Sequence, residues 1–226
     1  MKLEEIWSNI KMFAPSLLDG TIITIELTII SLIFSLVIGL LVALGKITFN
    51  KTINKICNVY ISIIRGTPLL VQLLYVYFVF PDIGISLTAF QAAIVALSLN
   101  ESAYLAETFR AGIKSVPKGQ MEAAQAIGMD YSMSMRRIVL PQAIRNVIPA
   151  IGNSAIILVK NSSLAAVITV SELMHNGNLL AASTFQNILI FTMVGIIYWG
   201  LHYPLSIIIN NLEKKGANHH VTSNQH

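Results

Sequence analysis

Charged side chains inside apolar segments are the feature of this 226-residue chain that could carry chemistry. A charge at the centre of a bilayer costs about 2.5–3.5 kcal/mol on insertion scales. Each is therefore expected to face the protein interior, a partner subunit or a watery cavity. The alternative for each is an internal ion pair that only fixes helix packing. The residues concerned are Glu26, Arg65, Glu101, Glu107 and Lys160.

One apolar segment carries a polar stripe that could line a path for a hydrophilic solute. Asn100, Tyr104 and Glu107 are spaced i, i+4 and i+7, which places them on one face of a helix. Glu101 lies beside that face, and its role stays open between path and packing, as does that of Glu26. A path with charges of both signs suits a zwitterion better than a simple cation or anion.

Two further segments are expected to bring polar groups to the same path. Arg65 stands in the run IRGTP at 64–68, where glycine and proline loosen a helix. Backbone groups freed at membrane depth persist only where they line a cavity or are buried in protein. Lys160 precedes the polar run NSS at 161–163, and we include Ser162 with Lys160 in the predicted path.

Composition places the chain in a membrane. Hydrophobic residues make up 54% and charged residues 12%, about half the charged fraction usual in soluble domains. The single cysteine, Cys57, excludes a disulfide within the chain and supplies no metal cluster. The histidines near the C-terminus have no carboxylate or cysteine partner nearby, so we expect no metal site. We also expect no catalytic residues and no nucleic-acid partner.

The hydropathy pattern predicts an all-α membrane protein. Residues 1–19 have apolar side chains at helical spacing and are expected to form an amphipathic helix along the membrane surface. A transmembrane domain is expected over 20–210, followed by a disordered cytoplasmic tail at 211–226. Five stretches have the length that crosses a hydrocarbon core. They are 20–44, 60–80, 89–109, 147–168 and 187–209.

The distribution of lysine and arginine orients these spans. Five spans place the two termini on opposite sides, and cytoplasmic loops carry the excess of basic residues. With the N-terminus outside, the outer segments hold only Lys2 and Lys11. The inner segments then hold Lys46, Lys51, Lys55, Arg110, Lys114, Lys118, Arg136, Arg137, Arg145, Lys214 and Lys215. We therefore expect a cytoplasmic C-terminus and a cytoplasmic loop at 115–143.

That loop, which we call the elbow (residues 115–143), has the pattern of two helices joined by a hard turn. Pro117 suits the first turn of a helix, and residues 118–127 are mostly good helix formers. Gly128 can take the left-handed conformation that ends a helix. Asp130 or Ser132 can cap a second helix, which is expected to end near Pro141.

The motifs of the chain resemble those of ABC importer permeases, in particular the branch for polar amino acids. The elbow has the order of the EAA loop: Glu122-Ala123-Ala124, then Gly128, then an Ile-x-Leu-Pro that ends with Leu140 and Pro141. Four blocks are similar to that branch: IRGTPLLVQL at 64–73, LNESAYLAETFRAGI at 99–113, SVPKGQMEAAQAIG at 115–128 and LVKNSSLAAVITVSEL at 158–173. One departure is Asn161-Ser162-Ser163, where the family more often has Asp-Thr-Ser, and it removes a charge.

This resemblance implies a type I ABC importer permease fold and a set of partners. The elbow would dock as a coupling helix into a groove on one of two ATP-binding cassette subunits, through Glu122, Ala123, Ala124, Gly128, Leu140 and Pro141. A second permease subunit, either a copy or a relative, and an extracytoplasmic amino-acid-binding protein would complete the complex. The chain would need no cofactor of its own, since ATP would be bound by the partner subunit.

Two other functions remain to be weighed. The stretch from Gly39 to Lys46 has the wrong spacing for a phosphate-binding loop and lacks the final Ser or Thr, so the chain cannot bind ATP in this way. A secondary transporter or channel for a small polar solute would more often show repeated halves and would have no use for the elbow. A membrane enzyme would need convergent catalytic groups, and His202 beside Tyr203 is the only hint of them.

Overall fold

The computed structural model describes residues 3–48 and 50–223, and the side chains of 4–48 and 50–211. Every regular element in this part of the chain is helical, which confirms the expected all-α class. The elements are α1 (Leu3–Ile47), α2 (Lys51–Gly66), α3 (Leu69–Leu74), η1 (Tyr75–Val79), η2 (Phe80–Ile83), α4 (Ala89–Ser115), α5 (Lys118–Ala126), α6 (Tyr131–Ser134), η3 (Met135–Val139), α7 (Leu140–Asn161), η4 (Ser162–Ile168), α8 (Leu173–Thr184) and α9 (Asn187–Ser223).

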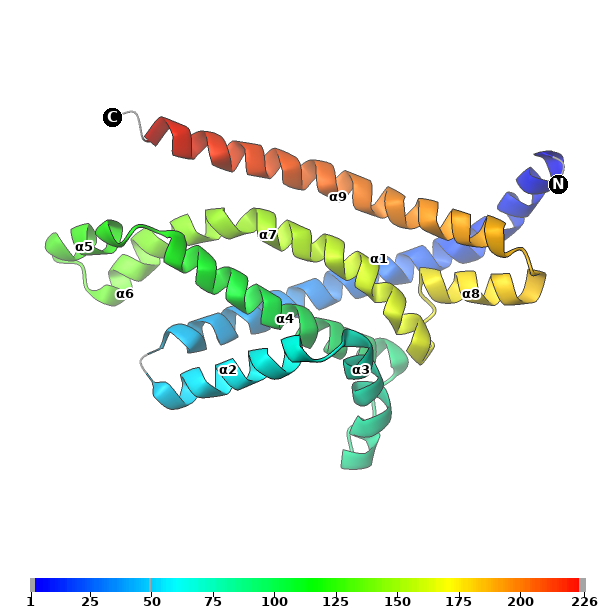
Figure 1. Cartoon of the computed structure of the whole chain (residues 1–226), viewed down its shortest axis with the longest axis horizontal. Helices are drawn as coiled ribbons and strands as arrows, with labels where there is room; N and C mark the ends of the chain where they lie inside the picture. The colour runs from blue at the N-terminus through cyan, green and yellow to red at the C-terminus, as the bar shows by residue number, and fades with distance from the viewer. Residues whose placement is uncertain (1–2, 49, 224–226) are drawn as a thin grey trace.

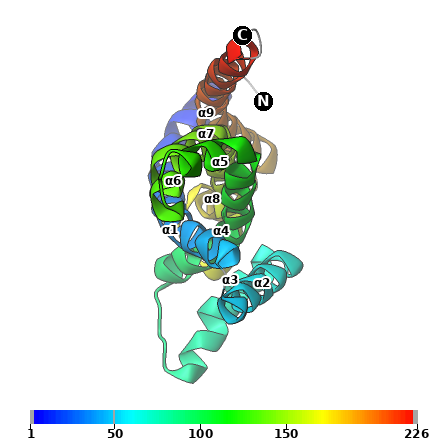
Figure 2. The same ribbon diagram turned by 90° about the vertical axis from the view of Figure 1, so that its left-hand side faces the viewer.

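The long helices form an elongated bundle whose two ends carry different parts of the chain. The start of α1 lies at one end, near α8 and the loop that leads into α9 (Figure 1). The short helices α5 and α6 lie at the other end. Viewed from that end, α2 and α3 project from the side of the bundle (Figure 2). The elbow is thus far from the N-terminus.

The terminal segments are continuous with long helices. α1 runs from Leu3 through Pro15 to Ile47 without interruption, so residues 3–19 do not form a separate helix. Phe13 and Leu17 are buried against α8 and α9, which explains how the bundle holds this segment. At the other terminus α9 continues to Ser223. Residues 211–223, expected to be disordered, therefore have helical backbone, while residues 1–2 and 224–226 lie outside the described part.

Length and apolarity identify fewer spans than the sequence pattern does. Among the described residues, Glu4–Ile47, Tyr131–Ile168 and Asn187–Asn211 are long and apolar enough to cross a membrane. A bent pair, Lys51–Gly66 with Leu69–Ile83, adds a fourth if it is counted as one span. The expected third span lies within α4, which is long enough but carries the polar stripe described above.

The expected second span, 60–80, is not one straight helix. α2 ends at Gly66, and α3 begins after Thr67 and Pro68 at an angle of 105° to it. Proline has no N–H and its ring clashes with the preceding turn, so the chain leaves the helix at this point. The sequence correctly predicted that this segment is loosened, but not that the helix breaks.

The centre of the bundle is the contact between α1 and α4. Buried side chains of α1, α3, α4 and η4 form one apolar core, which includes Leu27, Leu73, Leu97 and Ile168. Gly39 permits the close approach of the two long helices, because a Cβ there would lie 3.0 Å from the carbonyl oxygen of Ser102. This rigid pair supports the polar residues of α4.

A buried carboxylate, Glu172, fastens α8 to the bundle. It is fully buried and caps α8 by accepting a hydrogen bond from the backbone N–H of His175 at 2.7 Å. The Tyr198 hydroxyl of α9 donates to its other oxygen at 2.7 Å, and the Thr24 hydroxyl of α1 donates at 3.4 Å. One side chain therefore links three helices.

Replacing Glu172 by alanine is expected to destabilise the protein by about 2–4 kcal/mol, because the cap is lost and buried donors are left without a partner. The measurement is the melting temperature of the purified protein in detergent. Glu172→Gln keeps an acceptor for the cap and should recover part of the loss, while Tyr198→Phe removes one bond and should have a smaller effect. An unchanged melting temperature for Glu172→Ala would contradict this role.

Candidate functional site

A polar cavity of about 460 Å³ lies where α4 and α7 meet the break between α2 and α3. We call it the polar cavity. The break contributes its residues 67–69, α4 contributes one polar face, and α7 contributes residues at helical spacing. The lining residues are Thr67, Pro68, Leu69, Asn100, Glu101, Tyr104, Thr108, Ala150, Asn153, Ser154, Ile157 and Asn161.

Gln72 holds the broken backbone beside this cavity. Its amide nitrogen donates to the carbonyl oxygens of Ile64 at 2.8 Å and Thr67 at 3.1 Å, and to the Thr67 hydroxyl at 2.8 Å. Its amide oxygen accepts a hydrogen bond from Asn100 at 3.0 Å. Carbonyls freed by a break at membrane depth need such partners. Gln72 thus couples the break to the polar face of α4.

Among the described residues of the lining, Glu101 is the only carboxylate. It is 3% exposed, and its carboxylate makes a side-chain hydrogen bond with Ser154 of α7. No lysine or arginine forms an ion pair with it in the described part of the chain. A buried carboxylate without a counter-charge at a cavity wall is suited to bind a cation or an ammonium group.

A positive charge contacts one of the side chains that line the cavity. The guanidinium of Arg65 lies 5.1 Å from the ring centroid of Tyr104, which lines the cavity and is partly exposed. This is the geometry of a cation–π contact. Arg65 is itself exposed at the end of α2. The pair leaves the guanidinium N–H groups free to meet an anionic group.

The structure assembles some of the predicted path residues and separates others. Asn100, Glu101 and Tyr104 line the polar cavity, and Arg65 contacts Tyr104. Glu107 does not line it: it forms ion pairs with Lys46 of α1 and Arg110 of α4, which is the packing alternative.

The remaining predicted residues also lie outside the lining. Lys160 is exposed at the end of α7. Ser162 is fully buried and donates to the carbonyl oxygen of Val159 at 2.7 Å. Its neighbour Asn161 lines the cavity instead. Glu26 is exposed on α1 among apolar side chains and is not a lining residue either.

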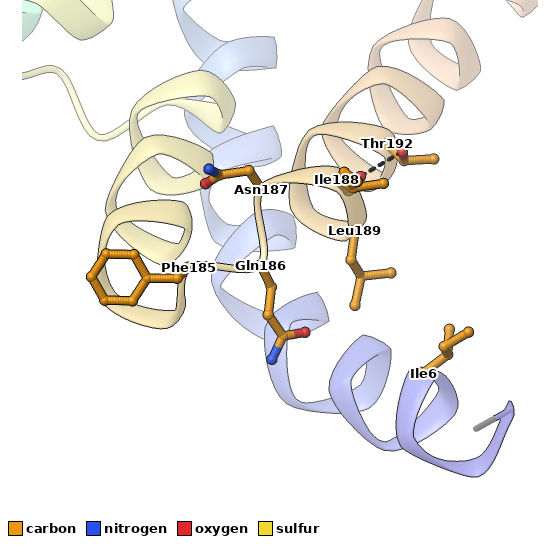
Figure 3. A pocket seen from close by; sticks show the side chains of 7 residues that line it. All are labelled: Ile6, Phe185, Gln186, Asn187, Ile188, Leu189 and Thr192. Carbon is orange, nitrogen blue, oxygen red and sulfur yellow. Dashed lines mark hydrogen bonds between the residues drawn. The ribbon is translucent and has the colours of Figure 1, made fainter. Parts of the chain in front are cut away.

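A second hollow, of about 680 Å³, lies at the N-terminal end of the bundle. Ile6 and Leu189 face each other across it, and the Phe185 ring points away from them (Figure 3). Gln186 extends toward it and accepts a hydrogen bond from Asn9 at 2.8 Å. The described residues of its lining include no charged side chain, so it is less suited to a zwitterionic solute than the polar cavity.

The elbow contains the hard turn that the sequence predicts. α5 ends at Ala126, and Gly128 follows with φ +90°, the left-handed region in which glycine is favoured. Asp130 caps α6 by accepting a hydrogen bond from the N–H of Met133 at 2.7 Å. Ile127, at the turn itself, is 81% exposed. An apolar side chain thus projects from the tip of the elbow.

The two alanines of the elbow occupy different faces of α5. Glu122 and Ala123 are exposed, whereas Ala124 is 4% exposed. Behind α5, Val116, Val139 and Ala143 form a small apolar cluster that fixes the elbow against the start of α7.

The second helix of the elbow does not end near Pro141. α6 passes through the π-helical turn η3 into α7, which begins at Leu140 and carries Pro141 in its first turn. A π turn widens the backbone ladder and so accommodates a proline ring. The side-chain amide of Gln142 adds a hydrogen bond at this point by donating to the carbonyl oxygen of Ile138 at 3.0 Å. The second helix of the elbow is therefore continuous with α7.

Sequence reasoning missed several residues of the site. The sequence did contain an indication of Gln72, since it is a lone amide in an apolar run four residues after Pro68. Asn153, Ser154 and Asn161 repeat at helical spacing but are diluted by apolar neighbours. For metal binding, no group of three or more His, Cys, Asp or Glu side chains comes together in the described part of the chain.

Comparisons with known proteins agree on one family. The model for "Binding-protein-dependent transport system inner membrane component" matches residues 35–216. The L-cystine transport system permease protein of Bacillus subtilis (strain 168) is 41% identical over 204 residues, covering 90% of this chain and 87% of that protein. The arginine transport system permease protein of the same strain is 39% identical over 202 residues, covering 89% and 92%.

A solved structure is similar over nearly the whole chain. It is described as an amino acid ABC transporter with histidines, and it has a TM-score of 0.88 and 36% sequence identity. The match covers 95% of this chain and 100% of that one. The helical arrangement described above is therefore that of an ABC importer permease.

Proposed function

The chain belongs to the family of binding-protein-dependent transport system inner membrane components, and from this premise we propose that its polar cavity conducts a polar amino acid into the cell. The observation that carries this proposal is that the cavity has one group of each charge: Glu101 lies in its wall, and Arg65 contacts the lining residue Tyr104. These two groups match the ammonium and the carboxylate of a zwitterion. Relatives named for cystine and arginine transport support an amino acid as the solute.

The energy for transport comes from other polypeptides. The elbow docks on one of two ATP-binding cassette subunits, with the exposed Ile127, Glu122 and Ala123 toward it. Because α6, η3 and α7 are continuous, a displacement of the elbow is transmitted along α7 to Asn153, Ser154 and Asn161. The cavity wall then moves relative to α4, which changes access to the solute. ATP hydrolysis by the partners thus drives the path open and closed.

The remaining partners and the orientation follow from the same assignment. The elbow end is cytoplasmic and the N-terminal end is outside, as the distribution of basic residues predicts. A second permease subunit, either a copy or a relative, lies beside this chain. An extracytoplasmic amino-acid-binding protein delivers the solute at the outer end. The chain itself is a translocation subunit of the cytoplasmic membrane without an ATPase site.

Co-purification tests this function. A tagged version of the chain, extracted in mild detergent, is expected to bring an ATPase with it, identified by mass spectrometry and by ATP hydrolysis. A secondary transporter or channel would instead purify alone. Recovery of the folded chain without any ATP-hydrolysing partner would refute the proposal.

A further inference from the structure

The polar cavity has only two charged groups in or next to its wall, among the described residues. Glu101 is its only carboxylate, and Arg65 is the only cation in contact with a lining side chain among the described residues. The other polar side chains in the wall are neutral amides and hydroxyls. They are Thr67, Asn100, Tyr104, Thr108, Asn153, Ser154 and Asn161.

The other charged residues that were predicted to line the path, and that could bind an ionised side chain of the solute, lie outside the cavity. Glu107 is neutralised by Lys46 and Arg110 at the cytoplasmic end of α4. Lys160 is exposed and does not line the cavity. The ammonium and carboxylate of a zwitterion therefore meet Glu101 and Arg65, the two charged groups that the cavity provides. A third charge, on the side chain of the solute, would meet only neutral groups.

Neutral groups in a desolvated site select against a third charge. An ionised group that leaves water without a counter-charge loses solvation that hydrogen bonds to amides only partly replace. A solute side chain with a neutral amide or hydroxyl loses much less solvation free energy, since the amides and hydroxyls of the wall can replace its hydrogen bonds to water. Asn153 and Asn161 supply both, at the wall opposite α4.

We propose that the solute is an amino acid whose side chain is polar and uncharged, of the amide or hydroxyl class. This inference rests on the proposed function and narrows the substrate of the same cavity. Glu101 binds the ammonium, Arg65 binds the carboxylate, and the amides of α7 bind the side chain. Asn161 is then a specificity-determining residue.

Direct binding to the membrane complex tests this selectivity. The chain is purified with its ATPase and reconstituted in lipid nanodiscs without the binding protein, so that the selectivity of that protein does not contribute. Radiolabelled glutamine is bound and then displaced by serine, arginine or glutamate. We expect arginine and glutamate to bind at least about tenfold more weakly than glutamine.

A charge-adding variant makes the test specific. Asn161→Asp places a second carboxylate in the wall and is expected to improve arginine binding relative to glutamine about tenfold. Asn58→Asp adds the same charge on exposed α2, outside the cavity lining, and should leave the ratio unchanged. Arginine or glutamate binding as tightly as glutamine in the unmodified complex overturns this inference but leaves amino-acid transport intact. Absence of binding by every amino acid overturns both.

Discussion

Replacing Gly128 by valine is expected to lower ATP-driven solute uptake by at least about tenfold. The residue has φ +90°, and a β-branched side chain is strongly disfavoured there. A Cβ at this position would meet no atom within 4 Å, so the penalty comes from the backbone rather than from crowding. To relieve it, the turn changes shape and the elbow loses its fit to the ATPase. The measurement is uptake of radiolabelled amino acid into proteoliposomes.

Two variants separate coupling from general stability. Gly84 has φ +86° and equally open surroundings, but it follows η2 and lies outside the elbow. Gly84→Val should therefore impose similar strain without uncoupling the ATPase. Gly128→Asn should retain most uptake, because asparagine tolerates the left-handed region. Equal losses for Gly84→Val and Gly128→Val would show that the elbow has no special role.

Replacing Glu101 by glutamine is expected to weaken solute binding by about 2–5 kcal/mol, the usual effect of removing one partner of a buried charge pair. The amide has nearly the same shape and can still hydrogen-bond Ser154, so the fold should be preserved. What disappears is the negative charge that meets the ammonium group. Equilibrium binding of radiolabelled solute to the reconstituted complex measures the loss, and co-purification of the ATPase should be unaffected.

Glu26→Gln is the matched control for this variant. It removes the same charge from an apolar segment, but Glu26 is exposed on α1 and is not a lining residue. Binding should stay as in the unmodified chain. If Glu101→Gln binds the solute as tightly as the control does, the carboxylate is not part of the path.

Helical periodicity predicted part of the cavity because it identifies the face of a helix. Asn100 and Tyr104 lie on the predicted face of α4 and line the cavity. Glu107 continues the same spacing, but it lies farther along α4, where Lys46 of α1 meets it. Which residue of α1 stands opposite depends on how two helices cross, and the spacing within one helix contains no such information.

Two other differences occur where the helix type changes locally. Ser162 begins the 3₁₀-helix η4 and its hydroxyl donates back to the carbonyl oxygen of Val159, whereas its neighbour Asn161 lines the cavity. At Pro141 the π turn η3 continues a helix that proline was expected to end. By contrast, the turn at Gly128 was predictable because it depends on a single residue type. Of the two caps that the sequence allowed, Asp130 and Ser132, the structure uses Asp130.

Uptake by purified components tests the central claim that this chain moves its solute only with the work of a separate ATPase. Proteoliposomes are prepared with the complete complex and, separately, with this chain alone, and binding protein and radiolabelled solute are then supplied at the side of the N-terminus. The account predicts accumulation that requires the ATPase and ATP at the elbow side, and none with the chain alone under an ion gradient. Concentrative uptake by the chain alone would contradict it.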